Sequence, residues 1–384
     1  MAVCSWKGVV DASQTSQGGR SLALGPQTRV FLAGVGRGAS EEVMKLAVRA
    51  VAEATTDFSW LSKGDVVFIK PALNSGNPYP ATTNPIAIGV MVELLKQKGA
   101  GRVIVGDMCG IEQVKLSPKG LSGSSRRLME ASGMARAVQA AGGEIHFFEE
   151  AGWGAFYEDA PAAGSHWKRG LMLPHILKEV EHIILMPRCS RHVLAGSTLG
   201  LKAAVGYWRG DTRLEYHRDA STFQEKTAEG NTVETLRKKQ RLVVSAADKI
   251  LITFGPDEGH VFQPENGLVI ASESVVAHDM VSLAWLLENR RNIETSGKEW
   301  VKDNSPWVAR IGNHYVVSKL GGWGPALASE KLTKNDLHAI WDDRVLNRAY
   351  EVFGGMPRVI LEAANNALAE NLKKRLSEMT TPSA

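Results

Sequence analysis

The densest group of chemically useful side chains in this 384-residue sequence lies between Arg188 and Arg218. This stretch carries six cations and two anions, and its net charge of +4 equals the formal net charge of the whole chain. Because guanidinium groups bind carboxylate, sulfonate and phosphate through paired hydrogen bonds, the stretch predicts a basic cleft for a small organic anion. A solvated charged loop with local ion pairs is the alternative interpretation. The predicted anion-binding residues of the stretch are Arg188, Arg191, Lys202, Arg209 and Arg213.

Two histidines of the same stretch, His192 and His217, are the candidates for moving a proton. Histidine has the side-chain pKa nearest to neutrality, so we predict that His192 is a general acid–base and that His217 is the second candidate. Asp107 would orient or polarise His192, and the neighbouring cations would lower the pKa of His192. A histidine that only fixes its loop is the structural alternative. A metal site that joins both histidines to Asp107 or Asp211 is weaker, because the spacing matches no established metal-binding motif.

The overall composition excludes several classes of protein. With 44% hydrophobic and 22% charged residues, the chain can bury a large core. No apolar run reaches about 18 residues, so we predict no membrane partner, and a charge of +4 without a basic–aromatic stripe argues against nucleic acid. We find no signal peptide and no Cys-x-x-Cys pair, so we predict a cytoplasmic protein without an intrinsic iron–sulfur cluster. The three cysteines are Cys4, Cys109 and Cys189.

The elements that must position these residues are short apolar runs alternating with helical patterns. This alternation predicts an α/β fold, with a mostly parallel sheet, helices on both faces and two closely packed lobes. In such a sheet, ligands bind beyond the carboxyl ends of the strands. We therefore predict that Lys70, Asp107, Arg188 and His192 share one cleft, because each follows a predicted strand, and that Asn74 joins the anion-binding residues. The predicted strands and the polar residues after them are Val66–Ile69 with Lys70 and Asn74, Val103–Val105 with Asp107, Ile183–Met186 with Arg188 and His192, and Ala247–Thr253 with Asp257, Glu258 and His260.

The chain shows no internal repeat and no clear linker. We divide it into a mobile N-terminal arm over residues 1–27, an α/β core over 28–290, and a last segment over 291–384 that packs on the core. Within the core, the pattern predicts a polar helix over Thr222–Arg241 before the strand Ala247–Thr253. In the last segment, residues 292–325 are predicted to be rich in loops, and Asp342–Arg375 is predicted to be helical.

Three separated segments of the chain resemble the family known as domain of unknown function 362. The first includes Lys70-Pro71-x-Leu73-Asn74 and continues through Thr82-Thr83-Asn84-Pro85 to Asp107. The second includes Pro187-Arg188-x-x-Arg191-His192 and Gly196-x-Thr198-Leu199-Gly200-Leu201-Lys202. The third is Ala271–Asp279, and together the segments span residues 60–285. The order of the three makes the resemblance more specific than any one of them.

The resemblance implies an α/β fold and little settled chemistry. Many relatives carry ferredoxin-type iron–sulfur modules, which implies redox work. This chain lacks those cysteines, so it would need an external electron donor or would do no redox chemistry. The chain departs from the family pattern at Ala72, where asparagine is usual, and at Ala203, where asparagine is also usual. The Lys-x-x-x-His piece that is usual in the family appears here with arginines, Arg188 and Arg191, before His192. A specialised substrate pocket explains these departures, as does the loss of an ancestral activity.

We therefore predict an enzyme that acts on a small organic anion, with redox chemistry, carbon–heteroatom cleavage and isomerisation left open. The alternatives are a non-catalytic protein that binds anions or partners in electron transfer, and a metal-dependent enzyme. The cofactor is unknown, and a homodimer is compatible with the sequence. An aromatic substrate would fit the tryptophans near the basic stretch, although large aromatic residues more often pack in cores. These tryptophans are Trp153, Trp167, Trp208 and Trp323.

Overall fold

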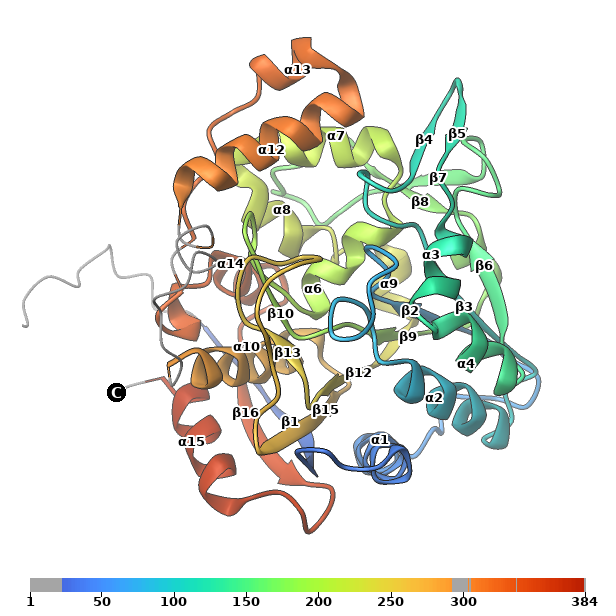
Figure 1. Ribbon diagram of the computed structural model, residues 1–384, viewed down its shortest axis with the longest axis vertical. Coiled ribbons are helices and arrows are strands. Elements are labelled where there is room, and N and C mark those ends of the chain that lie inside the picture. The colour runs from blue at the N-terminus through green and yellow to red at the C-terminus, as the bar shows by residue number, and fades with distance from the viewer. Residues whose placement is uncertain (1–22, 292–302, 304, 336, 383–384) are drawn as a thin grey trace, which may run out of the picture.

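An eight-stranded sheet crosses the centre of the computed structural model, which describes residues 23–291, 303, 305–335 and 337–382 (Figure 1). Strand β15 is antiparallel to both of its neighbours, and the remaining strand pairs of this sheet are parallel. The mostly parallel α/β fold is therefore confirmed. In spatial order the strands are β16 (Met356–Ala363), β1 (Leu24–Gly36), β15 (Asn266–Ser272), β12 (Gln240–Ala247), β9 (His182–Met186), β2 (Val66–Pro71), β3 (Arg102–Asp107) and β6 (Glu144–Phe147).

Hydrophobic layers cover both faces of this sheet. Successive side chains of a strand point to opposite faces, and in β1 Val30 and Leu32 belong to one buried cluster while Ala33 and Val35 belong to the other. The first cluster also holds residues of α10 (Val275–Arg291), α14 (Arg344–Val352) and α15 (Glu370–Thr380). The second holds residues of α1 (Glu41–Thr55) and α2 (Pro85–Gln97). The predicted helices on both faces are confirmed, whereas the division into two lobes stays a prediction.

Local capping fixes where the helices on the sheet begin. Ser40 accepts a hydrogen bond from the backbone N–H of Val43 at the start of α1, and Asn84 accepts bonds from the N–H groups of Ile86 and Ala87 at the start of α2. None of the described helices is long and apolar enough to cross a bilayer. The remaining helices are α3 (Ser125–Ala131), α4 (Met134–Ala140), α5 (Ile176–Glu179), α6 (Gly200–Ala203), α7 (Gly210–Arg218), α8 (Phe223–Glu229), α9 (Glu234–Lys239), α12 (Pro306–Gly321) and α13 (Trp323–Leu327), with short 3-10 turns at η1 (Ala204–Tyr207), η2 (Ala220–Thr222) and η3 (Ile340–Asp342).

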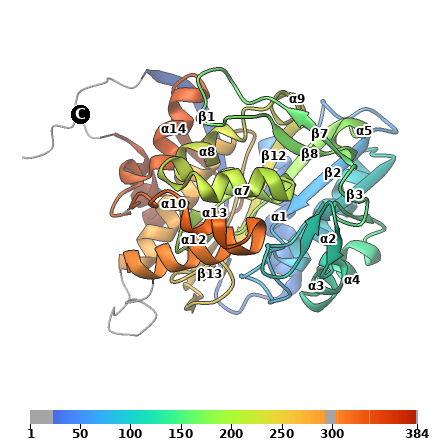
Figure 2. The same cartoon turned by 90° about the horizontal axis from the view of Figure 1, so that it is seen from above.

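A second, smaller sheet follows the carboxyl end of β9. Its strands lie in the order β11 (Gly196–Thr198), β10 (Ser190–His192), β13 (Ile250–Leu251) and β14 (Val261–Phe262). Two hairpins complete the strands: β4 (Lys115–Ser117) with β5 (Gly120–Ser122), and β7 (Phe156–Asp159) with β8 (Leu171–Pro174). Helices α7 and α12 pack side by side (Figure 2).

Two predictions around residue 240 are wrong. The predicted helix Thr222–Arg241 is divided into α8 and α9, and the sheet strand β12 already begins at Gln240. The run Lys238–Arg241 is polar, which resembles the end of an exposed helix, so the sequence hides the start of the strand. The predicted strand Ala247–Thr253 contains the last residue of β12 and the short β13, which belongs to the smaller sheet. Three of the four predicted strand ends therefore belong to the main sheet.

The C-terminal region also differs from its prediction. Helices α12 and α13 occupy most of the part of 292–325 that the structure describes, which excludes residues 292–302 and 304. The predicted helical region Asp342–Arg375 contains the edge strand β16, which pairs with β1. Gly354 and Gly355, with φ of 87° and 132°, end α14 and turn the chain into this strand. Residues 1–22 of the predicted arm lie outside the described residues, and Leu24–Gln27 belong to β1.

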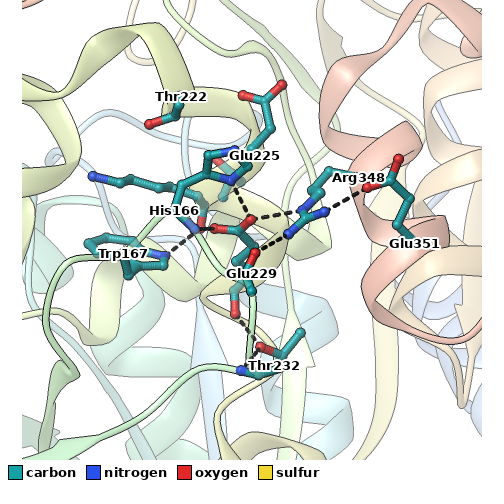
Figure 3. A network of polar contacts seen from close by, with 12 residues as sticks. His166, Trp167, Thr222, Glu225, Glu229, Thr232, Arg348 and Glu351 are labelled. Atoms are coloured by element: carbon teal, nitrogen blue, oxygen red, sulfur yellow. Dashed lines mark hydrogen bonds and ion pairs between the residues drawn. The ribbon is translucent and has the colours of Figure 1, made fainter.

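A buried carboxylate at the end of α8 ties three distant segments together (Figure 3). Glu229 accepts hydrogen bonds from the ring of His166 at 2.6 Å and from the backbone N–H of the same residue at 2.9 Å. Arg348 of α14 donates to Glu229 at 2.8 Å and also contacts the exposed Glu351 at 2.6 Å. Glu229 is 1% exposed, so its charge depends on these partners.

We predict that Glu229→Gln lowers the free energy of unfolding by about 2 kcal/mol, the usual contribution of hydrogen bonds to a charged group. The uncharged amide donates from one of its two atoms and so loses one of the contacts to His166 or Arg348. Urea unfolding followed by circular dichroism measures the change, and Glu351→Gln is the matched control, with an expected change below about 0.5 kcal/mol. Equal changes in the two variants would contradict the account.

Candidate active site

A cavity of about 190 Å³ lies where β9, β2 and β3 end. Of the ten predicted site residues, eight line it: Lys70, Asn74, Asp107, Arg188, His192, Lys202, Arg213 and His217. Four of the eight lie at or just after the carboxyl ends of three adjacent parallel strands, as expected for an open α/β sheet: Lys70, Asn74, Asp107 and Arg188. The smaller sheet supplies His192, and the helices α6 and α7 supply the others. The arrangement brings the predicted residues together, while their chemical roles stay predictions.

An ion pair between Lys70 and Asp107 forms one wall of the cavity. The Lys70 amine lies 2.8 Å from the Asp107 carboxylate, and the two side chains are 1% and 4% exposed. The carboxylate also accepts the backbone N–H groups of Leu73 and Met108, at 3.0 and 2.8 Å. Burial raises the pKa of Asp107 and lowers that of Lys70, and the attraction between the two opposes both shifts. The described hydrogen bonds of Asp107 do not include His192, so the predicted orienting contact is not made.

Gly206 allows this pair to lie directly against the backbone. A Cβ atom at this position would stand 2.3 Å from Asp107 Oδ1 and 2.5 Å from Lys70 Nζ. The Gly206 carbonyl accepts a hydrogen bond from Arg213 at 3.1 Å. Arg213 also donates to the carbonyls of Cys109 and Met108, at 2.8 and 3.0 Å, and so binds backbone oxygens instead of a carboxylate.

The buried charges of the cavity are uneven. Lys70, Arg188 and Arg213 are 1%, 2% and 6% exposed, whereas Asp107 is the one carboxylate among the described lining residues that is buried to a similar degree. Arg188 donates to the Ala81 carbonyl, and the Nε atoms of Arg188 and Arg213 have no hydrogen-bond partner in the described part of the chain. Burial lowers the pKa of both arginines, but guanidinium groups stay charged in proteins. The cavity therefore favours an anion.

His192 presents a hydrogen-bond donor to the cavity. Its Nδ1 atom accepts the backbone N–H groups of Leu194 and Ala195, at 3.1 and 3.4 Å, so the proton of the neutral ring lies on Nε2. Burial, and then the charges of Lys202 and Arg188, lower the pKa of His192 well below its usual value. The direction agrees with the expectation, although burial is a larger cause than the neighbouring cations. A neutral ring with its proton on Nε2 is a donor to a ligand, not a base.

His217 presents the opposite atom. Asn313 of α12 donates through Nδ2 to the His217 carbonyl at 2.9 Å, which turns its Oδ1 toward the ring. His217 Nδ1 lies 2.9 Å from that oxygen and must donate to it, so Nε2 carries a free lone pair. Burial, together with Lys202 and Arg213, lowers the pKa of His217 to about 3. His217 is therefore a neutral acceptor, and its role as the second candidate for proton transfer stays a prediction.

Lys202 lies on α6, and its amine forms no hydrogen bond or ion pair with any residue that the structure describes. Burial and the charges of Arg188 and Arg213 lower the pKa of this amine to about 7. The third resemblance segment explains how α6 is held. Asp279 accepts the backbone N–H groups of Gly200 and Leu201, both at 2.7 Å, at the start of the helix.

Two predicted anion-binding residues lie outside the cavity. Arg191 pairs with the buried Asp303 at 3.1 Å. Arg209 pairs with Asp211 at 2.9 Å and stacks on the ring of Trp153, so neither guanidinium is directed at the site. Local ion pairs thus account for these two of the six cations in the basic stretch. The predicted aromatic contacts are also not made, because none of these four tryptophans lines the cavity: Trp153, Trp167, Trp208 and Trp323.

Sequence reasoning missed several lining residues. Asp257 accepts the amide of Asn74 at 3.2 Å, and its position after a predicted strand was the available signal. Thr198 has a buried hydroxyl without a partner among the described residues, and it lies inside the second resemblance segment. Val316 and Leu320 of α12 form another wall of the cavity. They were missed because residues 292–325 were predicted to be rich in loops.

The metal alternative finds no support in the described residues, which contain no group of three or more His, Cys, Asp or Glu placed to hold an ion. Both Asp107 oxygens and His192 Nδ1 already accept hydrogen bonds from the protein. Cys109 and Cys189 are buried in the two different hydrophobic clusters, and Cys4 lies outside the described residues. The expectation of no intrinsic iron–sulfur cluster stays a prediction.

We predict that nitrogen-15 NMR finds His192 with its proton on Nε2 and His217 with its proton on Nδ1. His192→Gln and His217→Gln assign the two sets of signals. Because both pKa values are lowered, we expect both rings to stay neutral as the pH falls from 8 to 5. Two rings with the same tautomer, or a ring that gains its proton near pH 6.5, would contradict the assignment.

Comparisons with known proteins were made for the whole chain. A family model described as domain of unknown function (DUF362) matches residues 67–284. A search of curated proteins gives no match. Two similar solved structures, each 10% identical with a TM-score of 0.39, are a structural-genomics protein from Thermotoga maritima and the lactate racemase apoprotein from Thermoanaerobacterium thermosaccharolyticum. The alignments cover 67% of this chain and 60% of the first, and 90% of this chain and 86% of the second.

The family match contains the residues that build the cavity from the sheet. It begins inside β2, before Lys70, and it ends inside α10, after Asp279. The chain spans 60% of the length of the Thermotoga maritima structure. Because the family model covers more than half of the 384 residues, this protein belongs to the DUF362 family.

Proposed function

We propose that this protein is an enzyme that binds a small organic anion in the cavity and catalyses proton transfer on it. The observation that carries the proposal is the uneven set of buried charges, three cations and one carboxylate. Lys70 and Asp107 form a direct pair, whereas no carboxylate in the described residues forms an ion pair with Arg188 or Arg213. Asp257 and Asp107 attract Arg188, and Asp107 attracts Arg213, only from a longer distance. An anionic group of the substrate would compensate these charges.

Arg188 is the better candidate to hold the anionic group. Arg213 uses both terminal nitrogens on the backbone carbonyls of Cys109, Met108 and Gly206. Arg188 has one hydrogen bond, from Nη1 to the Ala81 carbonyl. A carboxylate would accept from the remaining N–H groups of Arg188, while Arg213 would add its charge.

The two histidines supply the proton-transfer chemistry. His192 Nε2–H would donate a hydrogen bond to a substrate oxygen on which negative charge develops, which lowers the energy of the transition state. His217 Nε2 would accept the proton, and its bond to Asn313 would hold the ring in place. A donor and an acceptor that face one anion site suit isomerisation and elimination. Redox chemistry would need the external electron donor that the resemblance implies.

The test is hydrogen exchange in D2O, in which a panel of short 2-hydroxy and 2-oxo acids is incubated with the full chain and analysed by mass spectrometry. We expect deuterium in at least one acid. His217→Gln should lower kcat by about 10²–10⁴-fold, as for a lost general base. Arg188→Gln should raise KM by roughly 10- to 100-fold, as for a lost charged hydrogen bond.

Arg209→Gln is the matched control, because this arginine has the same charge and lies outside the cavity; its KM should not change. Saturable binding of an acid without any exchange would favour the non-catalytic binding protein. An equal loss in the Arg188 and Arg209 variants would contradict the assigned site.

A further inference from the structure

The amine of Lys202 lines the cavity, and the proposed function gives it no task. Lys202 is partly buried, and its amine has no hydrogen bond or ion pair within the described chain. Lys70, the other lysine among the described lining residues, is bonded to Asp107 and to the Pro71 carbonyl. A lysine amine without a partner is available to react with a ligand.

The backbone under Lys202 is held in place from both sides. Asp279 binds the N–H groups of Gly200 and Leu201, and a Cβ at Gly200 would stand 2.7 Å from the Asp279 carboxylate. Asn231 donates to the Leu201 carbonyl at 2.8 Å. These contacts fix the first turn of α6, so the base of the Lys202 side chain starts from a rigid position.

The surroundings of Lys202 favour its neutral form. Burial disfavours the charged amine, and the positive charges of Arg188 and Arg213 add to this effect, so the pKa of Lys202 is lowered to about 7. About half of the amine is therefore neutral near pH 7, compared with less than roughly one part in a thousand for an exposed lysine. The neutral amine is the nucleophilic form.

We propose that Lys202 Nζ forms an imine with the carbonyl carbon of a 2-oxo acid whose carboxylate binds Arg188. This inference rests on the proposed function, because it places the same anion at the same arginine. A 2-oxo acid is the smallest substrate with a carbonyl next to its anionic group. Because Arg188 and Lys202 line the same cavity, such an acid bound at Arg188 would present its carbonyl to the Lys202 amine.

The step conserves atoms and electrons. The Nζ lone pair forms the C–N bond while the carbonyl π pair moves to oxygen, where His192 Nε2–H donates a hydrogen bond. Both hydrogens of the amine pass to that oxygen, with His217 Nε2 carrying them, and the oxygen leaves as water. The imine draws electrons from the neighbouring carbon, so His217 can next remove a proton there.

Reductive trapping tests the inference. The full chain is treated with pyruvate and sodium cyanoborohydride at pH 7, and the modified lysine is located by peptide mass spectrometry. We expect one adduct, on Lys202, formed on the order of 100-fold faster than adducts on exposed lysines, because more of this amine is neutral. Lys115 and Lys119, both exposed, are internal controls in the same sample. Lys202→Arg should abolish the fast adduct.

Propanal, which has a carbonyl and no carboxylate, tests the recognition of the acid. Arg188→Gln should slow trapping by pyruvate more than trapping by propanal. The variant removes the carboxylate contact for pyruvate alone, whereas the loss of the Arg188 charge raises the pKa of Lys202 for both compounds. Equal trapping of the two compounds in the wild type would overturn the 2-oxo acid as substrate class. Saturable binding of pyruvate by calorimetry without an adduct on Lys202 would overturn the imine and leave the anion site standing. Neither binding nor an adduct would contradict the inference and the proposed function together.

Discussion

The unequal burial of charge at the carboxyl ends of β9, β2 and β3 is the constraint on which the rest of the site depends. Three cations and one carboxylate lie below a tenth of full exposure there. The Lys70–Asp107 pair is neutral as a whole, and Gly206 leaves space for it. Burial lowers the pKa of Lys202 and of both histidines, and the remaining arginine charge adds to this effect, from both arginines at Lys202, from Arg188 at His192 and from Arg213 at His217. An anion would thus compensate the charge and also change the reactivity of the groups around it.

The segments that carry the family resemblance are joined by specific contacts. Thr83 accepts the N–H of Ala72 at 2.7 Å and donates to the Met186 carbonyl at 2.6 Å, so it links the end of β2 to the end of β9. Asp279 of α10, a helix that packs directly against α6, caps α6. These contacts explain why the first, second and third segments belong together: each positions a group of one cavity. Asn313 of α12 lies outside the region that the family model matches, and its hydrogen bond fixes the tautomer of His217.

Much of the site could be predicted from the sequence because neighbouring parallel strands end at one edge of a sheet, which brings Lys70, Asp107 and Arg188 together. Composition could not show which arginines face inward. Arg209 has the charge and the neighbourhood of a ligand-binding residue, yet Asp211, two positions later, binds it. The edge strand β16 was missed because its partner β1 lies more than 300 residues earlier. The tautomers of His192 and His217 could not be predicted from the sequence either, because they depend on backbone N–H groups and on the distant Asn313.

The most direct test of the central claim is a crystal structure of the full chain soaked with 3-bromopropionate, whose bromine gives an anomalous signal. The account predicts one bromine peak in the cavity, with the carboxylate within hydrogen-bonding distance of Arg188 and near Arg213. A cavity that holds only water while Asp257 turns to pair with Arg188 would contradict it. In that case the buried cations would be balanced by the protein itself, and the site would need no anion.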